Sequence, residues 1–188
     1  MTEIYELFKL SKRFSSKYTK YFDVYEKLFN KYKGKDINFL EIGVQNGGSL
    51  EIWKNYFGEN SKIIGIDLNP SCKKFEKDNI YIEIGSQSDQ RFWADFFSKY
   101  GMIDIVLDDG GHTNYQQIVT LDCCIKKIKD GGLLITEDTH TSYIDLFSNP
   151  NKYNCGPYEQ VCGDFFSDAT SVLKQFKTYY GKRGDFYN

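Results

Sequence analysis

Neither a long apolar run nor an excess of positive charge is present in the 188 residues of this sequence. The missing apolar run argues against a transmembrane helix. The locally basic start, MTEIYELFKLSKRFSSKYTKYF, lacks the continuous apolar segment of a signal peptide. The formal net charge of −2 argues against a nucleic acid or an anionic membrane as partner, because both usually select a basic protein. A globular protein with one sizeable core is therefore expected.

The five cysteines form no framework for disulfides or zinc. Their number is odd, and none is spaced as Cys-x-x-Cys. Reduced thiols in the cytoplasm are the simplest interpretation. The G-x-S-x-G motif of serine hydrolases and a phosphate-binding loop are also missing. The pattern of strands and turns therefore has to supply the functional information.

Short apolar runs rich in β-branched residues alternate with stretches of helical character. Strands are expected at residues 37–44, 62–69, 80–85, 103–107 and 133–136. Helices are expected at residues 22–32, 49–57, 70–77, 88–100, 114–130 and 164–180. This alternation predicts an α/β fold with a doubly wound parallel sheet. A helical segment at 1–36 and an α/β unit at 37–188 are expected to form one domain.

The first expected strand runs into a glycine-rich turn and a helix, in FLEIGVQNGGSLEIW. Gly43, Gly47 and Gly48 allow close approach of a ligand, and the helix offers free N–H groups. Asp67 ends the second strand, where open α/β sheets usually present a carboxylate to ribose hydroxyls. Capping of the helix near Pro70 is the alternative. The layout serves both NAD and S-adenosylmethionine, although G-x-x-x-G-G differs from the G-x-G-x-x-G of NAD-dependent oxidoreductases.

Acidic pairs follow the fourth and fifth expected strands, in VLDDGGHTNY and ITEDTHTSY. If the two strands are neighbours, their ends lie roughly 5 Å apart, and Asp108, Asp109, Glu137 and Asp138 crowd one rim. Such carboxylates repel one another unless a cation or protons compensate. Oxygen ligands favour Mg²⁺ before Ca²⁺ or Mn²⁺. Solvated acids are the alternative for either pair alone, but two pairs, one followed by His112, favour a metal site.

These motifs together resemble the metal-dependent sugar O-methyltransferases of macrolide biosynthesis, the mycinamicin type of class I methyltransferase. The resemblance covers roughly residues 18–143 and is most specific in D-D-G-x-H and E-D-x-H-T-S-Y. It implies S-adenosylmethionine-dependent, Mg²⁺-assisted methylation of a sugar hydroxyl in a glycoside or polysaccharide precursor. Methylation of a non-sugar vicinal diol, or a cofactor-binding module without turnover, are the alternatives.

The resemblance also implies a role for individual residues. The implied metal ligands are Asp109, Glu137 and Asp138, and His112 is the implied general base. The implied cofactor contacts are Glu41, Gly43, Gly47, Gly48, Ser49, Asp67, Gln87 and Asp108. The implied substrate contacts are His140, Thr141 and Tyr143. The partner is then a small molecule or a glycan.

The sequence departs from the family pattern at three places. Ser86 stands where the family usually has an acidic residue, and SSKYTKY stands where it has an Asp-Lys motif. The family continues into two more strands, whereas this sequence ends at GKRGDFYN. A sheet that lacks or shortens its last strands is therefore expected, together with self-association or cover by residues 164–180, because a bare strand edge favours aggregation.

Overall fold

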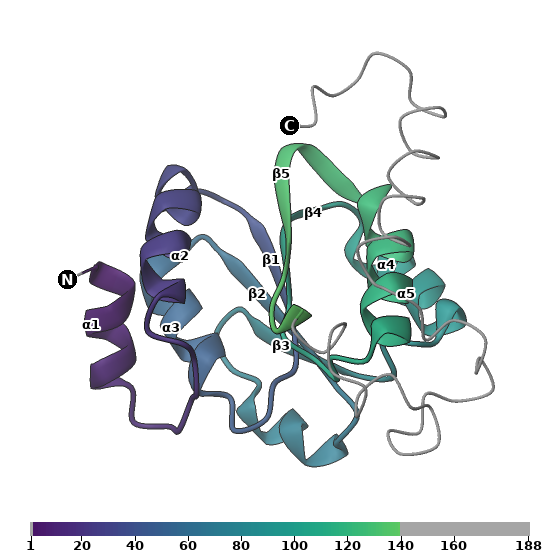
Figure 1. Ribbon diagram of the computed structural model, residues 1–188, viewed down its shortest axis with the longest axis horizontal. Helices are drawn as coiled ribbons and strands as arrows, with labels where there is room; N and C mark the ends of the chain where they lie inside the picture. The colour runs from purple at the N-terminus through teal and green to yellow at the C-terminus, as the bar shows by residue number, and fades with distance from the viewer. Residues whose placement is uncertain (1, 140–188) are drawn as a thin grey trace.

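The computed structural model describes residues 2–139, which form a three-layer α/β sandwich (Figure 1). Its sheet consists of β1 (Asn38–Ile42), β2 (Lys62–Asp67), β3 (Ile80–Ile84), β4 (Ile103–Asp108) and β5 (Ile128–Thr136). All the pairings are parallel, and the strand order is β3-β2-β1-β4-β5. The predicted doubly wound parallel sheet is thus confirmed. The helix expected at 164–180 and the question of further strands lie outside the described residues.

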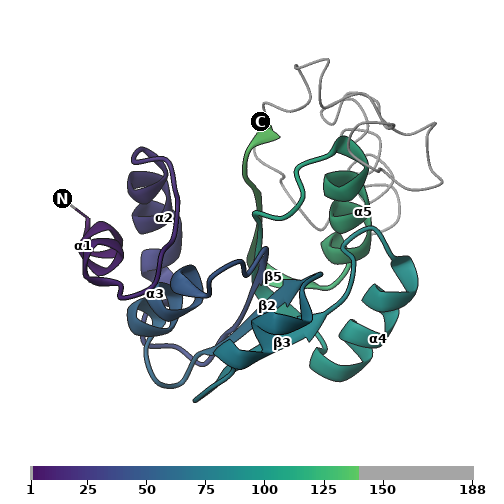
Figure 2. The ribbon, with the colours of Figure 1, turned by 90° about the horizontal axis from the view of Figure 1, so that it is seen from below.

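Helices cover both faces of the sheet, as two perpendicular views agree (Figures 1 and 2). One face carries α1 (Glu3–Leu10), α2 (Tyr21–Phe29), the 3₁₀ turn η1 (Asn30–Tyr32) and α3 (Gly48–Phe57). The other face carries α4 (Gln90–Tyr100) and α5 (Asn114–Ile125), and the 3₁₀ segment η2 (Pro70–Phe75) follows β2. Between residues 2 and 139, no helix has the length and apolar character needed to cross a membrane.

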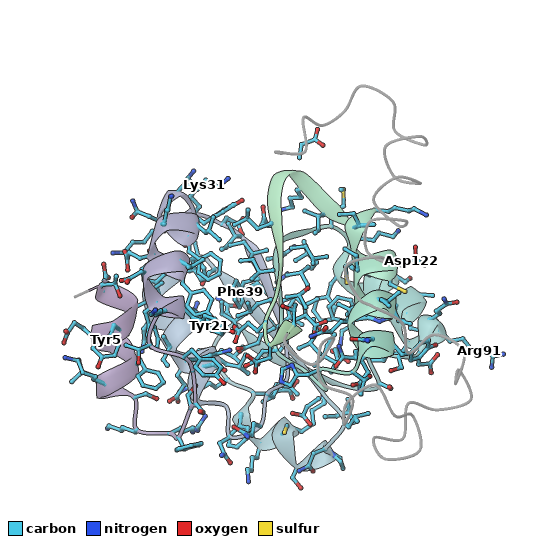
Figure 3. The ribbon with its side chains drawn as sticks, in the orientation of Figure 1. Tyr5, Tyr21, Lys31, Phe39, Arg91 and Asp122 are labelled. Carbon is cyan, nitrogen blue, oxygen red and sulfur yellow. The ribbon has the colours of Figure 1, made fainter. Side chains whose placement is uncertain are left out.

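Two hydrophobic cores lie on the two faces of the sheet because successive strand residues point in opposite directions. Phe39 of β1 packs beneath α2 and α3, where its ring centroid lies 5.8 Å from that of Phe29 and 5.4 Å from that of Trp53 (Figure 3). The next residue, Leu40, belongs to the opposite core with Trp93 of α4. Burial of both faces holds β1 and its neighbour β4 in the interior of the sheet, and this fixes where their carboxyl ends lie.

The ends of several helices differ from the expectation. Helix α1 lies within the helical segment expected at 1–36, although no separate helix was delimited there, and residues 70–75 form a 3₁₀ segment rather than an α-helix. The expected helix at 114–130 ends at Ile125, because β5 already begins at Ile128, opposite Ile103. A register shift follows, so that Ile105 pairs with Leu133, and Gly131 has a φ of 77°. The residues between form a bulge, which local propensity does not reveal.

Candidate active site

A cleft of about 640 Å³ opens at the carboxyl ends of the strands. It lies where the strand order reverses between β1 and β4, the usual place for a ligand in an open α/β sheet. Eight of the predicted residues line it: Gly43, Gly48, Ser49, Asp67, Gln87, Asp109, His112 and Asp138. The residues predicted from the β1 turn and from the β4 and β5 ends therefore face one cavity.

The turn after β1 packs closely against the backbone of other segments of the chain. Gly43 has a φ of 96°, and its N–H donates to the carbonyl of Ile66 at 2.9 Å. A Cβ atom on Gly43 would overlap the carbonyl oxygen of Asp109. A Cβ on Gly47 would meet the ring of Phe75, and one on Gly48 would meet the carbonyl oxygens of residues 13 and 14. These glycines therefore allow the chain to pack on itself at the edge of the cleft.

Asp67 ties the end of β2 to the β1 turn. Its Oδ2 accepts hydrogen bonds from the backbone N–H groups of Val44, at 3.0 Å, and Gln45, at 2.9 Å. Its Oδ1 accepts from the N–H of Asn69 at 2.8 Å. Asn69, not Asp67, caps the segment that begins at Pro70. The Asp67 carboxylate thus stands in the cleft wall in a fixed orientation, with one lone-pair position of Oδ1 left for a ligand.

Gln87 and Asp108 form a buried pair behind the turn that follows β4. The side-chain amide of Gln87 donates to Asp108 Oδ1 at 3.0 Å, and Gln87 Oε1 accepts from the N–H of Gly111 at 2.8 Å. Burial raises the pKa of Asp108 to about 6. Gln87 faces the cleft, whereas Asp108 lies behind the lining residues. The predicted contribution of Asp108 to the cofactor site is therefore indirect in this geometry, through the orientation of Gln87.

Asp109, His112 and Asp138 come together in one part of the cleft wall, the acidic end. His112 Nε2 lies 3.7 Å from Asp109 Oδ1 and 3.6 Å from Asp138 Oδ2. His112 and Asp138 have φ angles of 58° and 53°, a strained conformation that often marks functional positions. One ligand atom from each side chain lies within 4.8 Å of the others, close enough for one cation to contact all three. The donor set suits a hard or borderline divalent ion.

Glu137 does not join this group, although the sequence predicts it as a metal ligand. Its side chain is only 4% exposed and accepts hydrogen bonds from Lys17 Nζ, at 3.0 Å, and from the Tyr25 hydroxyl. Burial raises the pKa of Glu137, while Lys17 opposes this effect. Glu137 thus lies beside the cleft, and the cleft-facing cluster has His112 in its place.

Glu41 and Ser49 lie below the β1 turn, and a residue that the sequence did not predict joins them. Glu41 is fully buried, and its Oε2 accepts a hydrogen bond from Ser49 Oγ at 2.7 Å. Its Oε1 lies 3.5 Å from Lys17 Nζ, which also contacts Asp109 Oδ2 at 2.5 Å. Lys17 belongs to SSKYTKY, so the departure from the family motif was the available signal. The predicted substrate contacts His140, Thr141 and Tyr143 lie outside the described residues.

Comparison with known proteins relates this arrangement to methyltransferases that modify glycosylated natural products. The demethylmacrocin O-methyltransferase of Streptomyces fradiae is 31% identical over 138 residues, which are 68% of this chain and 34% of the relative. The mycinamicin VI 2''-O-methyltransferase of Micromonospora griseorubida is 33% identical over 128 residues, 63% of this chain and 31% of the relative. The chain thus spans about a third of the length of these relatives. No protein-family model matches the sequence.

Solved structures give the same relationship. MycE, a methyltransferase of the mycinamycin biosynthetic pathway in complex with Mg and SAH, superposes with a TM-score of 0.75 at 26% identity, over 94% of this chain and 49% of MycE. With mycinamycin VI also bound, MycE superposes with a TM-score of 0.70 at 26% identity, over 84% of this chain and 46% of MycE. The chain therefore belongs to the sugar O-methyltransferase family of macrolide and glycoside biosynthesis, which has the class I methyltransferase fold.

Proposed function

We propose that this protein transfers the methyl group of S-adenosylmethionine to a hydroxyl of a sugar in a glycoside, with Mg²⁺ at the acidic end of the cleft. The observation that carries the proposal is the shared cavity: the β1 turn and Asp67 line one end, and Asp109, His112 and Asp138 line the other. A cofactor and an acceptor bound at the two ends would meet between them. The relatives are named for O-methylation of such acceptors, which supports the proposal.

The proposed cofactor end uses fixed backbone and one carboxylate. Asp67, oriented by three backbone N–H groups, is proposed to accept a hydrogen bond from a ribose hydroxyl. Gly43 keeps the β1 turn close to β4, and Gln87 presents its amide from the opposite wall. A sulfonium methyl group supplies the electrophile when the cofactor is bound. The cleft volume lies in the range of cofactor sites, so the residues present fit this ligand.

The proposed cation site uses the carboxylates after β4 and β5. Asp109 and Asp138 face the cleft and are proposed as ligands, with Glu137 as the third, linked to Asp109 through Lys17. A divalent ion held there would lower the pKa of a bound sugar hydroxyl. Imidazole accepts protons well near neutral pH, so His112 is proposed to take the hydroxyl proton on Nε2. A divalent ion can hold two adjacent hydroxyls of any acceptor, so a non-sugar vicinal diol is the alternative acceptor.

The test is turnover of the full chain with S-adenosylmethionine, Mg²⁺ and a panel of glycosides and catechols, read as a mass gain of one methyl group. EDTA should stop the reaction, and added Mg²⁺ should restore it. Asp109→Asn should raise the Mg²⁺ concentration needed for half-maximal rate, because a charged ligand is lost.

The matched control for this test is Asp89→Asn, since asparagine also caps helices and Asp89 caps α4 without lining the cleft. An unchanged rate in EDTA would remove the metal from the proposal. Binding of S-adenosylmethionine without turnover on any acceptor would favour the cofactor-binding module instead.

A further inference from the structure

Three side chains of the segment 17–25 reach the acidic residues that follow β4 and β5. Lys17 Nζ contacts Asp109 Oδ2 at 2.5 Å and Glu137 Oε1 at 3.0 Å. The hydroxyl of Tyr21 donates to Asp138 Oδ1 at 3.0 Å. Tyr21 stands at the end of α2 nearest the carboxyl ends of the strands (Figure 3). With the Tyr25 hydroxyl on Glu137, each of the three proposed metal ligands has a donor from this one segment.

The ammonium group of Lys17 is a buried counter-charge. Its side chain is 4% exposed, and those of Glu41 and Glu137 are 0% and 4% exposed. Within residues 2–139, no other lysine, arginine or histidine forms an ion pair with Glu41 or Glu137. Burial alone would lower the pKa of Lys17, but the surrounding carboxylates outweigh burial and raise that pKa above its usual value. Removal of this group would leave buried carboxylates unpaired, which is strongly destabilising.

Asp109 divides its two oxygens between Lys17 and the cleft. Oδ2 receives the ammonium group, while Oδ1 lies 3.7 Å from His112 Nε2. Lys17 therefore stands behind the carboxylate and leaves the oxygen that faces the cleft accessible to another cation. A divalent ion bound at Oδ1 would lie on a different side of Asp109 from the ammonium group, so the two need not exclude each other.

We propose that Lys17 is a built-in counter-ion that holds Glu41, Asp109 and Glu137 together before any divalent cation binds, while Tyr21 orients Asp138 toward the cleft. Lys17 and Tyr21 are thus positioning residues for the acidic end. The claim that these residues prepare the site for a divalent ion rests on the proposed function. The claim that Lys17 stabilises the protein without that ion is independent of it.

The main test compares the melting temperature of wild type and Lys17→Met in EDTA and in saturating Mg²⁺. In EDTA we expect Lys17→Met to melt on the order of 10 °C lower, because buried carboxylates lose their partner. Mg²⁺ should recover part of this loss, so its stabilising shift should be larger in the variant than in the wild type. Lys17→Arg, which keeps the charge, should recover most of the loss in EDTA. Lys20→Met is the matched control, since Lys20 is exposed and should leave the melting temperature unchanged.

A second variant covers the case in which Lys17→Met fails to fold. Tyr21→Phe removes one hydroxyl from a partly exposed side chain, so it should fold normally. Its Mg²⁺ dissociation constant, measured by calorimetry on the full chain, should rise about 10-fold, because the partners of ligands commonly have effects of that size.

The outcomes separate the two proposals. If Lys17→Met melts at the wild-type temperature in EDTA, the counter-ion role of Lys17 is wrong. It is also wrong if the wild type binds Mg²⁺ but Lys17→Met lowers the melting temperature equally in EDTA and in Mg²⁺. Unchanged Mg²⁺ affinity in Tyr21→Phe would overturn the role of Tyr21. If the wild type binds no Mg²⁺ but Lys17→Met melts early and Lys17→Arg does not, the counter-ion stands and the proposed metal role fails.

Discussion

The two ends of the cleft are held by different kinds of contact. At the end formed by β1 and β2, backbone N–H groups donate to Asp67, and the backbone approaches closely at Gly43. The N–H donors of the β1 turn lie 22 and 23 positions from Asp67 in the sequence. At the acidic end, side chains hold side chains, and the partners are 92 to 120 positions apart. One end thus depends on backbone contacts between neighbouring strand ends, whereas the other depends on the docking of the N-terminal segment.

Charge separates the two ends as well. Asp67 is satisfied by neutral N–H donors, which require no counter-ion. The acidic end holds Glu41, Asp109 and Glu137 around one ammonium group, and Asp138 lies near His112 and accepts a hydrogen bond from Tyr21. Changes at the first end should therefore alter cofactor affinity, and changes at the second should alter the response to cations and the rate. The following variants test that division.

The largest effect is expected from His112→Asn. Asparagine tolerates the positive φ of this position better than alanine does, so the backbone should stay in place. Loss of a general base typically costs ~10²- to 10⁴-fold in rate, while SAH affinity should stay near the wild-type value. The measurements are initial rates and calorimetric titration with SAH. Retention of most of the activity would assign the histidine to the turn alone, and loss of SAH binding would break the division between the ends.

Gly43→Ala should affect both ends, because Gly43 is where they touch. An alanine there has an unfavourable φ, and its Cβ overlaps the carbonyl oxygen of Asp109. We expect the free energy of unfolding to fall by about 2 kcal/mol or more, with weaker SAH binding and a slower rate. Gly34→Ala is the matched control, since Gly34 has a φ of 71° but open space for a Cβ. Equal losses in the two variants would show that backbone strain alone, not the contact with β4, matters at Gly43.

Asp67→Asn should weaken SAH binding about 10-fold, since hydrogen bonds to a charged group are worth ~1.5–3 kcal/mol and each tenfold change in affinity corresponds to 1.4 kcal/mol. The Mg²⁺ concentration for half-maximal rate should not change. Asp78→Asn, at an exposed position, serves as the control. Tight binding of NAD with no response to SAH would contradict the proposed ligand of this end.

The smallest effect is expected from Ser49→Ala. Ser49 lines the cleft, but its hydroxyl donates to Glu41, which is the link to Lys17. We expect a loss of about 1 kcal/mol in the free energy of unfolding, measured by urea titration, and nearly unchanged SAH affinity. The opposite result, weaker SAH binding at unchanged stability, would assign the hydroxyl to the cofactor as the sequence predicts.

The same contrast explains what could be predicted from the sequence. The strands, the glycine turn and Asp67 follow from apolar runs and turn residues, which act within a short stretch of chain. The gathering of Asp109, His112 and Asp138 followed from the assumption that β4 and β5 are neighbours, which the sheet confirms.

The partner of Glu137 could not be predicted in this way. A compensating cation was expected for the crowded acids, but Lys17 comes from a segment whose approach depends on how α2 packs over the sheet. The bulge before Leu133 could not be predicted for a related reason, because β5 starts at Ile128 through pairing with β4 and not through local propensity.

The distance of 120 positions between Lys17 and Glu137 also bears on the order of folding. During synthesis, Lys17 emerges long before Glu137, whose charge it compensates. Closing a loop of that length costs conformational entropy before the contact can stabilise the fold, and this slows its formation. We therefore expect the segment 17–25 to dock after the sheet has formed. Substitutions of Lys17 or Tyr25 should then accelerate unfolding and hardly slow refolding, which stopped-flow kinetics can measure. The acidic end would be the last part of the cleft to assemble and the first to open.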